Sequence, residues 1–148
     1  MTAPPATVHA SAVLVGARAV LIRGPSGAGK SLLTLELIAA AQTGAVRFAR
    51  LVADDRAYLE ALNGRLLVRP AEALAGLIEL RGVGLRRLPH ERCAVVGLIV
   101  DLAGPDAERL PQPEQLQAMI EGISLPRLAV APGDRALPAV LALLKSWA

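Results

Sequence analysis

Eight consecutive residues, 24–31, combine glycines, a lysine and a serine in the order Gly-Pro-Ser-Gly-Ala-Gly-Lys-Ser. They fit the phosphate-binding pattern G-x-x-x-x-G-K-[ST] at every fixed position. Glycines let the backbone turn so that successive amide N–H groups face phosphate oxygens, and the following helix adds the positive end of its dipole. The lysine carries a charge for the outer phosphates, and the serine hydroxyl is a ligand for Mg²⁺. The predicted nucleotide-binding residues are Gly24, Pro25, Ser26, Gly27, Ala28, Gly29, Lys30 and Ser31.

Carboxylates after apolar segments are the next candidates for chemistry. Asp54 and Asp55 directly follow the apolar run at residues 51–53, and enzymes of phosphoryl transfer place carboxylates near the metal and the terminal phosphate. Adjacent side chains on an extended chain point in opposite directions, so we expect one of the two to face the nucleotide. Which one does so stays open, and a turn or a helix cap is the alternative. Glu79 also ends an apolar run, and the sequence leaves open whether it binds a metal.

Three more polar residues have no partner that the sequence identifies. His9 is expected on the first strand of a hairpin that precedes the glycine loop, and by itself it is interpreted as structural. Arg109 and Arg135 lie in or beside predicted loops, where arginines are usually solvated.

The elements that must position these residues are short apolar runs separated by turn residues. The pattern predicts a hairpin (13–15 and 19–22) before the loop, a helix (32–41) after it, and a strand at 51–53. It then predicts a second hairpin (57–62 and 66–68), and an apolar run at 77–80 leads into a glycine-rich segment. Strands at 95–100 and 125–130, a surface loop at 101–113 and a closing helix at 135–147 follow. Strands outnumber helices, which favours an α/β fold with a mixed sheet and flanking helices. Residues 1–6, rich in proline and alanine, are expected to be flexible.

The bulk composition restricts the function further. A chain of 148 residues fits one domain, and three aromatic residues among 53% hydrophobic ones predict an aliphatic core. A net charge of +3 favours an anionic partner, but dispersed arginines and scarce aromatics disfavour nucleic acid. The sequence shows no membrane span and no signal peptide. The single cysteine, Cys93, is predicted to be free and buried, which agrees with the cytoplasm.

Taken in order, these features resemble the catalytic domain of bacterial HPr kinase/phosphorylase, which phosphorylates a serine of HPr, the phosphocarrier of the sugar phosphotransferase system. The resemblance covers residues 8–144. Its most specific parts are Asp54-Asp55-Arg56 and the segment 78–84, Ile-Glu-Leu-Arg-Gly-Val-Gly, which looks like the family signature E-[IV]-R-G-x-G. Val8-His9, the loop 24–31, Glu108-Arg109-Leu110 and the segment 132–135 complete the similarity.

The resemblance implies a P-loop fold like that of phosphoenolpyruvate carboxykinase and an ATP-dependent serine kinase that uses Mg²⁺. Lys30 and the loop amides would hold ATP, Ser31 and Glu79 would bind the metal, and Asp54 or Asp55 would take the serine proton. His9 and Arg109 would orient and neutralise the phosphoryl groups. Arg81, Gly82 and Gly84 would help to form the site, and Arg135 would approach HPr or the transferred phosphate.

The chain also departs from the family pattern. Leu32 stands where the family usually carries glutamate, and the stretch between Gly84 and Arg109 looks shortened. The resemblance implies a short form, without the family's separate N-terminal domain and its C-terminal extension. The reverse phosphorolysis of phospho-HPr, metabolite control and a homo-oligomeric state are therefore left open. Two other functions also stay open: a P-loop kinase that acts on a small metabolite, and a nucleotide-binding sensor or adaptor without catalysis.

Overall fold

The computed structural model describes residues 7–147 as a mixed α/β structure. Its strands are β1 (Ala10–Val15), β2 (Arg18–Arg23), β3 (Ala49–Ala53), β4 (Ala57–Leu62), β5 (Arg65–Pro70), β6 (Leu77–Leu80), β7 (Gly84–Arg87), β8 (Ala94–Leu102), β9 (Gln117–Ile120) and β10 (Ile123–Val130). Its helices are α1 (Lys30–Gln42) and α2 (Leu137–Leu144), with 3-10 turns at Glu72–Leu74 and Pro113–Leu116. The predicted α/β class, with a mixed sheet and flanking helices, is confirmed. The six residues that were predicted to be flexible lie outside the described part.

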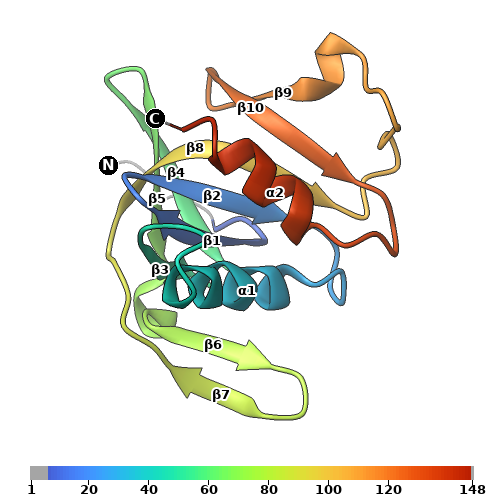
Figure 1. Ribbon diagram of the computed structural model, residues 1–148. Coiled ribbons are helices and arrows are strands. Elements are labelled where there is room, and N and C mark those ends of the chain that lie inside the picture. Colours follow the sequence, from blue (N-terminus) through green and yellow to red (C-terminus); the bar gives the residue numbers. More distant parts are fainter. Residues whose placement is uncertain (1–6, 148) are drawn as a thin grey trace.

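An eight-stranded mixed sheet organises the structure, and its main order is β3-β1-β2-β8-β10-β9 (Figure 1). β5 also pairs with the start of β8, and β4 pairs with β5. β1 is antiparallel to both β2 and β3, while β8 is parallel to both β2 and β10. β2, β3, β8 and β10 therefore point the same way, and their carboxyl ends form one side of the sheet, which we call the carboxyl edge. Ligands of open α/β sheets bind at such edges.

The core consists of two aliphatic clusters, as the scarcity of aromatic residues predicted. One cluster joins α1 and α2 to the sheet through fully or nearly fully buried residues such as Leu33, Leu37 and Val140. The other cluster contains Leu66 and Val68 of the β4–β5 hairpin and lies against the inner strands. Burial of one such side chain contributes about 1.5–3 kcal/mol, so the packing of α1 on the sheet fixes the glycine loop that leads into it.

The third hairpin, β6–β7, forms a separate two-stranded sheet that projects below α1 (Figure 1). β6 coincides with the apolar run noted at 77–80. β7 was not predicted, because every residue of Gly84–Arg87 is exposed and the segment has no buried apolar alternation. β9 was missed for the same reason: Gln117 and Met119 are exposed, and only part of the strand is shielded. The turn between β9 and β10 needs positive φ at Glu121 (51°) and Gly122 (77°).

Four other predictions are corrected. Asp101 and Leu102 belong to β8 and not to the predicted surface loop, and the closing helix is limited to Leu137–Leu144. His9 precedes β1 and does not lie on it. Cys93 is exposed, because it lies one residue before the point where β8 enters the core at Ala94. Within residues 7–147, no helix has both the length and the apolar character that crossing a membrane requires.

Candidate active site

Residues 24–31, which we call the glycine loop, connect β2 to α1 at the carboxyl edge of the sheet. Gly27 (φ 83°) and Gly29 (φ 102°) adopt the left-handed conformation that other residues rarely accept. A Cβ on Gly24 would lie 3.1 Å from both the Cβ and the carbonyl oxygen of Leu102, so only glycine lets the loop lie this close to the end of β8. The backbone geometry thus explains the glycines of the motif.

The lysine and the serine of the motif are the first two residues of α1. The Lys30 side chain is only 6% exposed, and its Nζ donates to the carbonyl oxygens of Gly24 (2.8 Å) and Pro25 (3.2 Å). The same Nζ lies 3.8 Å from Oδ1 of Asp55. The ammonium is therefore held between the backbone of the glycine loop and a carboxylate.

The carboxylate of Asp54 is the central hydrogen-bond acceptor of the site, and the residue is only 8% exposed. Its Oδ1 accepts hydrogen bonds from the hydroxyls of Ser31 (2.6 Å) and Ser11 (3.0 Å). Its Oδ2 accepts from the backbone N–H of Glu79 (3.0 Å). Three elements, α1, β1 and β6, thus converge on one carboxylate, and both of its oxygens are occupied.

Asp55 differs from its neighbour in both backbone and exposure. Its φ of 67° lies in the left-handed region, and the N–H of Arg56 donates across it to the carbonyl oxygen of Asp54 (2.8 Å). This three-residue γ-turn is strained, a property that is common at functional sites. The turn sends the Asp55 side chain outward, where it is 59% exposed, toward Lys30. The two carboxylates thus face different surroundings because of a turn, and not because of the extended chain that was expected, and which of them faces a nucleotide stays a prediction.

Ser11 is a site residue that the sequence analysis missed. It is fully buried in β1; its hydroxyl donates to Asp54 and accepts from the backbone N–H of Asp55 (3.0 Å). A serine inside the buried run Ala10–Val15 was the available signal, because a buried hydroxyl needs a partner.

The other predicted residues lie farther from this centre. The Glu79 side chain is exposed, and only its backbone contacts Asp54. Arg135 lies 3.7 Å from Glu36 of α1, and no polar contact within residues 7–147 joins His9 or Arg109 to either aspartate. Within the same residues no three His, Cys, Asp or Glu side chains cluster as metal ligands. The roles of His9, Glu79, Arg109 and Arg135 stay predictions, as do those of Arg81, Gly82 and Gly84 at the tip of the β6–β7 hairpin.

A cavity of about 440 Å³ borders the glycine loop. Residues 25–28 line one side of it, and residues 102–103 and 130–134 line the other. Residues 132–134 of the predicted segment 132–135 therefore line the same cavity as the glycine loop, and Arg135 is not among the lining residues.

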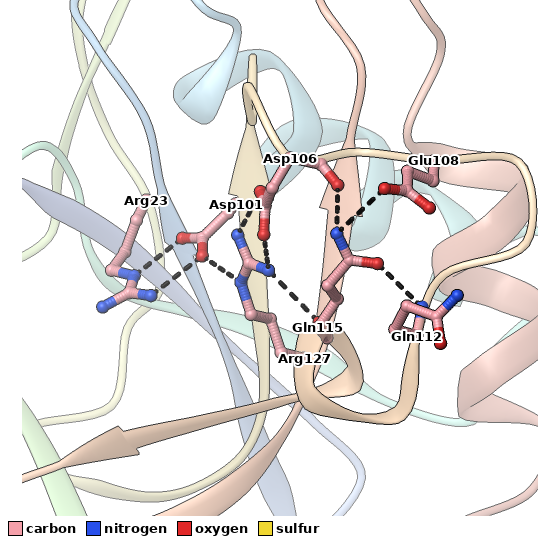
Figure 2. A network of polar contacts seen from close by, with 7 residues as sticks. All are labelled: Arg23, Asp101, Asp106, Glu108, Gln112, Gln115 and Arg127. Carbon is pink, nitrogen blue, oxygen red and sulfur yellow. Dashed lines mark hydrogen bonds and ion pairs between the residues drawn. The ribbon is translucent and has the colours of Figure 1, made fainter.

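A network of charged side chains adjoins the start of the glycine loop through Arg23 and was not predicted (Figure 2). Asp101 of β8 accepts two hydrogen bonds from Arg23 (2.7 and 2.8 Å), the residue directly before Gly24, and one from Arg127 of β10 (2.6 Å). Arg127 also donates to both carboxylate oxygens of Asp106 (2.7 and 2.9 Å) and to the carbonyl oxygen of Gln115. The network thus connects three strands at the carboxyl edge with the segment 103–116, which carries Arg109.

The environment of Asp101 shifts its pKa. Burial raises this pKa, but the hydrogen bonds and charges of Arg23 and Arg127 outweigh it and hold the pKa below the ordinary 3.8. The hydrogen bond from Arg127 also lowers the pKa of Asp106. The hydrogen bonds from Arg127 to Asp106 and Asp101 raise the pKa of Arg127, against the opposing effect of burial. The network is therefore ionised at neutral pH.

This shift predicts how stability depends on pH. A carboxyl group whose pKa is lower in the folded protein stabilises it above the unfolded pKa, and the contribution disappears as the pH falls through the folded pKa. We expect the free energy of unfolding to decrease below about pH 4, measured by urea denaturation between about pH 3 and pH 7. Asp101→Asn should flatten this decrease, whereas Glu60→Gln, at an exposed carboxylate, should leave it unchanged. An unaltered slope in Asp101→Asn would contradict the assignment.

Together, the fold and this site define a mixed α/β protein with a glycine loop and paired aspartates at the carboxyl edge. The HPr serine kinase C-terminal domain family matches residues 1–89, and the chain belongs to that family. The chain is 35% identical over 143 residues to the HPr kinase/phosphorylase of Geobacillus thermodenitrificans, covering 86% of this chain and 43% of the relative. It is 45% identical over 80 residues to that of Streptococcus thermophilus, covering 53% of this chain and 24% of the relative.

A solved structure shares the fold. The HPr(Ser) kinase/phosphatase from Coxiella burnetii superposes with a TM-score of 0.75 over 95% of both chains, at 24% sequence identity. The chain spans less than half the length of the Geobacillus and Streptococcus relatives.

Proposed function

We propose that this protein is an ATP-dependent serine kinase that phosphorylates an HPr-type phosphocarrier protein in the cytoplasm. The observation that carries the proposal is the meeting of Lys30, Ser31 and two dissimilar aspartates at one point of the carboxyl edge. The names of the relatives, HPr kinase/phosphorylase, support the choice of HPr as the acceptor. The basic chain, with a net charge of +3, agrees with a polyanionic nucleotide.

The residues present fit ATP and Mg²⁺. The glycine loop can present backbone N–H groups, and the Lys30 ammonium, now on carbonyl oxygens of the same loop, can move to phosphate oxygens. The hydroxyl of Ser31 and the carboxylate of Asp54, 2.6 Å apart, are oxygen ligands of the type that Mg²⁺ prefers. When bound, the metal would neutralise charge on the phosphates. The exposed carboxylate of Glu79, a residue whose backbone N–H already contacts Asp54, is a further oxygen donor in this proposal.

Asp55 is the proposed general base. A base must come within about 2.6–3.2 Å of the hydroxyl that it deprotonates. Asp54 is buried with both oxygens engaged, whereas Asp55 is 59% exposed beside Lys30. The serine oxygen of the acceptor attacks the γ-phosphorus, its proton passes to Asp55, and the bond to the bridging oxygen breaks to release ADP. In phosphorolysis, an oxygen of inorganic phosphate would attack the phosphorus of phosphoserine and the bond from this phosphorus to the serine oxygen would break. Protonated Asp55 would give its proton to that oxygen, and the products would be pyrophosphate and serine.

A transfer assay tests the proposal. The protein is incubated with HPr, Mg²⁺ and ATP labelled in the γ-phosphate, and the expected product is HPr labelled on serine. A second incubation, with phospho-HPr and phosphate, tests whether pyrophosphate forms. Binding of ATP without any transfer to protein would favour the nucleotide sensor, and transfer to small hydroxyl compounds alone would favour the metabolite kinase.

A further inference from the structure

The β6–β7 hairpin is held to the rest of the protein by one face only. Ile78 is fully buried on that face, while the register and the alternation of side chains place Glu79, Leu85 and Arg87 on the opposite face. All four residues of β7 are exposed, and the hairpin projects beyond α1 (Figure 1). A two-stranded sheet is only marginally stable alone. An exposed hairpin of this kind therefore suggests a contact with another molecule.

The exposed part of the hairpin combines apolar and cationic side chains. Leu85 is 62% exposed and Val83 at the tip is 51% exposed. Arg87 is exposed on the same face as Leu85, whereas Arg86 is exposed on the face of Ile78. The only carboxylate within residues 77–87 is that of Glu79. An apolar centre with an arginine border is the composition of many protein interfaces. We call Val83, Leu85 and Arg87 the hairpin surface.

The hairpin surface lies beside the proposed catalytic centre. The backbone N–H of Glu79 donates to Asp54, and Asp54 also binds the hydroxyl of Ser31. Glu79 in turn lies opposite Leu85 in the register of the hairpin. A macromolecule that brings a hydroxyl to Asp55 therefore meets the hairpin at the rim of the site.

We infer that the hairpin surface is the docking site for the protein that presents the acceptor serine. This partner protein would contact the hairpin surface with an apolar patch that has an acidic border. The inference rests on the proposed function and adds the surface that selects a protein acceptor. A second copy of the chain is a poorer occupant, because a symmetric contact would place the arginines of both copies together. Nucleic acid is also a poorer occupant, since phosphates would leave Leu85 and Val83 uncovered.

The test is a double variant on the outward face, Leu85→Ser with Arg87→Glu. Its affinity for HPr is measured by titration calorimetry, and its transfer kinetics are measured with HPr and ATP. We expect the dissociation constant and the KM for HPr to rise about tenfold or more, because the variant removes the apolar contact and reverses a charge. The dissociation constant for ATP and the kcat at saturating HPr should change less than about twofold.

The chain offers a matched control on the other exposed hairpin. Leu62 (50% exposed) and Arg65 pair directly in the β4–β5 hairpin, and Leu62→Ser with Arg65→Glu should leave the KM for HPr unchanged. An unchanged KM in the β6–β7 variant, or an equal rise in both variants, would overturn the inference. The inference would also be overturned if the wild-type protein did not bind HPr at about millimolar concentration. It would likewise be overturned if the β6–β7 variant lost self-association and nothing else. HPr binding that depends on the hairpin, without any phosphoryl transfer, would instead refute the proposed kinase and leave the docking surface intact.

Discussion

Asp55→Asn is expected to lower the rate of phosphoryl transfer to HPr by about a hundredfold to ten-thousandfold, the range that one positioned base supplies. Asparagine keeps the size of the side chain and cannot accept the serine proton. Binding of ATP should be as tight as in the wild type or tighter, because the variant removes a negative charge that lies 3.8 Å from the Lys30 ammonium. Initial rates of labelled phosphate transfer and titration with a fluorescent ATP analogue measure the two quantities.

Asp54→Asn separates the two aspartates. Asp54 accepts from Ser11, Ser31 and Glu79, so its amide would place an NH₂ donor against groups that already donate. We therefore expect a less stable protein and weaker binding of ATP with Mg²⁺, in contrast to Asp55→Asn. Glu60→Gln, at an exposed carboxylate of β4, is the control for loss of charge alone. Full transfer activity in Asp55→Asn would refute its assignment as the base.

The parts of the site that are contiguous in the sequence were predictable. The glycine loop follows its own strand and precedes its own helix, and its pattern of residue types can be recognised within eight consecutive residues. The position of Asp54 and Asp55 after an apolar strand likewise brought them to the correct edge. The different environments of Asp54 and Asp55 were not predictable. They depend on Ser11, 43 residues away from Asp54, and on a γ-turn without a sequence signature.

The charged network shows the same limit more strongly. Arg23 and Asp101 stand 78 residues apart, and Asp101 and Arg127 stand 26 apart. Arg23 and Asp101 follow apolar runs and Arg127 lies within one, so each looks like an ordinary charged residue in the sequence. Only the order β2-β8-β10 places them side by side, and that order is a property of the sheet. β7 and β9 have no apolar pattern and were not predicted. Each is stabilised by backbone pairing with a neighbouring strand and not by burial of its side chains. Charged residues on three neighbouring strands would have been the signal, but only if the order of the strands had been known.

Arg127 is the residue on which we expect this network to depend most. Its side chain is 13% exposed, and it bonds to Asp101, Asp106 and Gln115 together. Removing one partner of a buried ion pair costs about 3–5 kcal/mol, but Arg23 would still neutralise Asp101. Arg127→Met should therefore lower the free energy of unfolding by roughly 2–3 kcal/mol, measured by urea denaturation at pH 7.

Two further variants decide whether the geometry of the guanidinium or only its charge matters. Arg127→Lys keeps the charge but cannot hold both oxygens of Asp106 and also bond to Asp101, so we expect an intermediate loss. Arg135→Met removes an arginine that is 78% exposed and 3.7 Å from Glu36, and it should cost less than about 0.5 kcal/mol. If Arg127→Met had the same free energy of unfolding as Arg135→Met, the network would be a surface feature that does not stabilise the fold. If it is not, then Asp101, packed beside the residue that precedes Gly24, couples the stability of β10 and the segment 103–116 to the glycine loop.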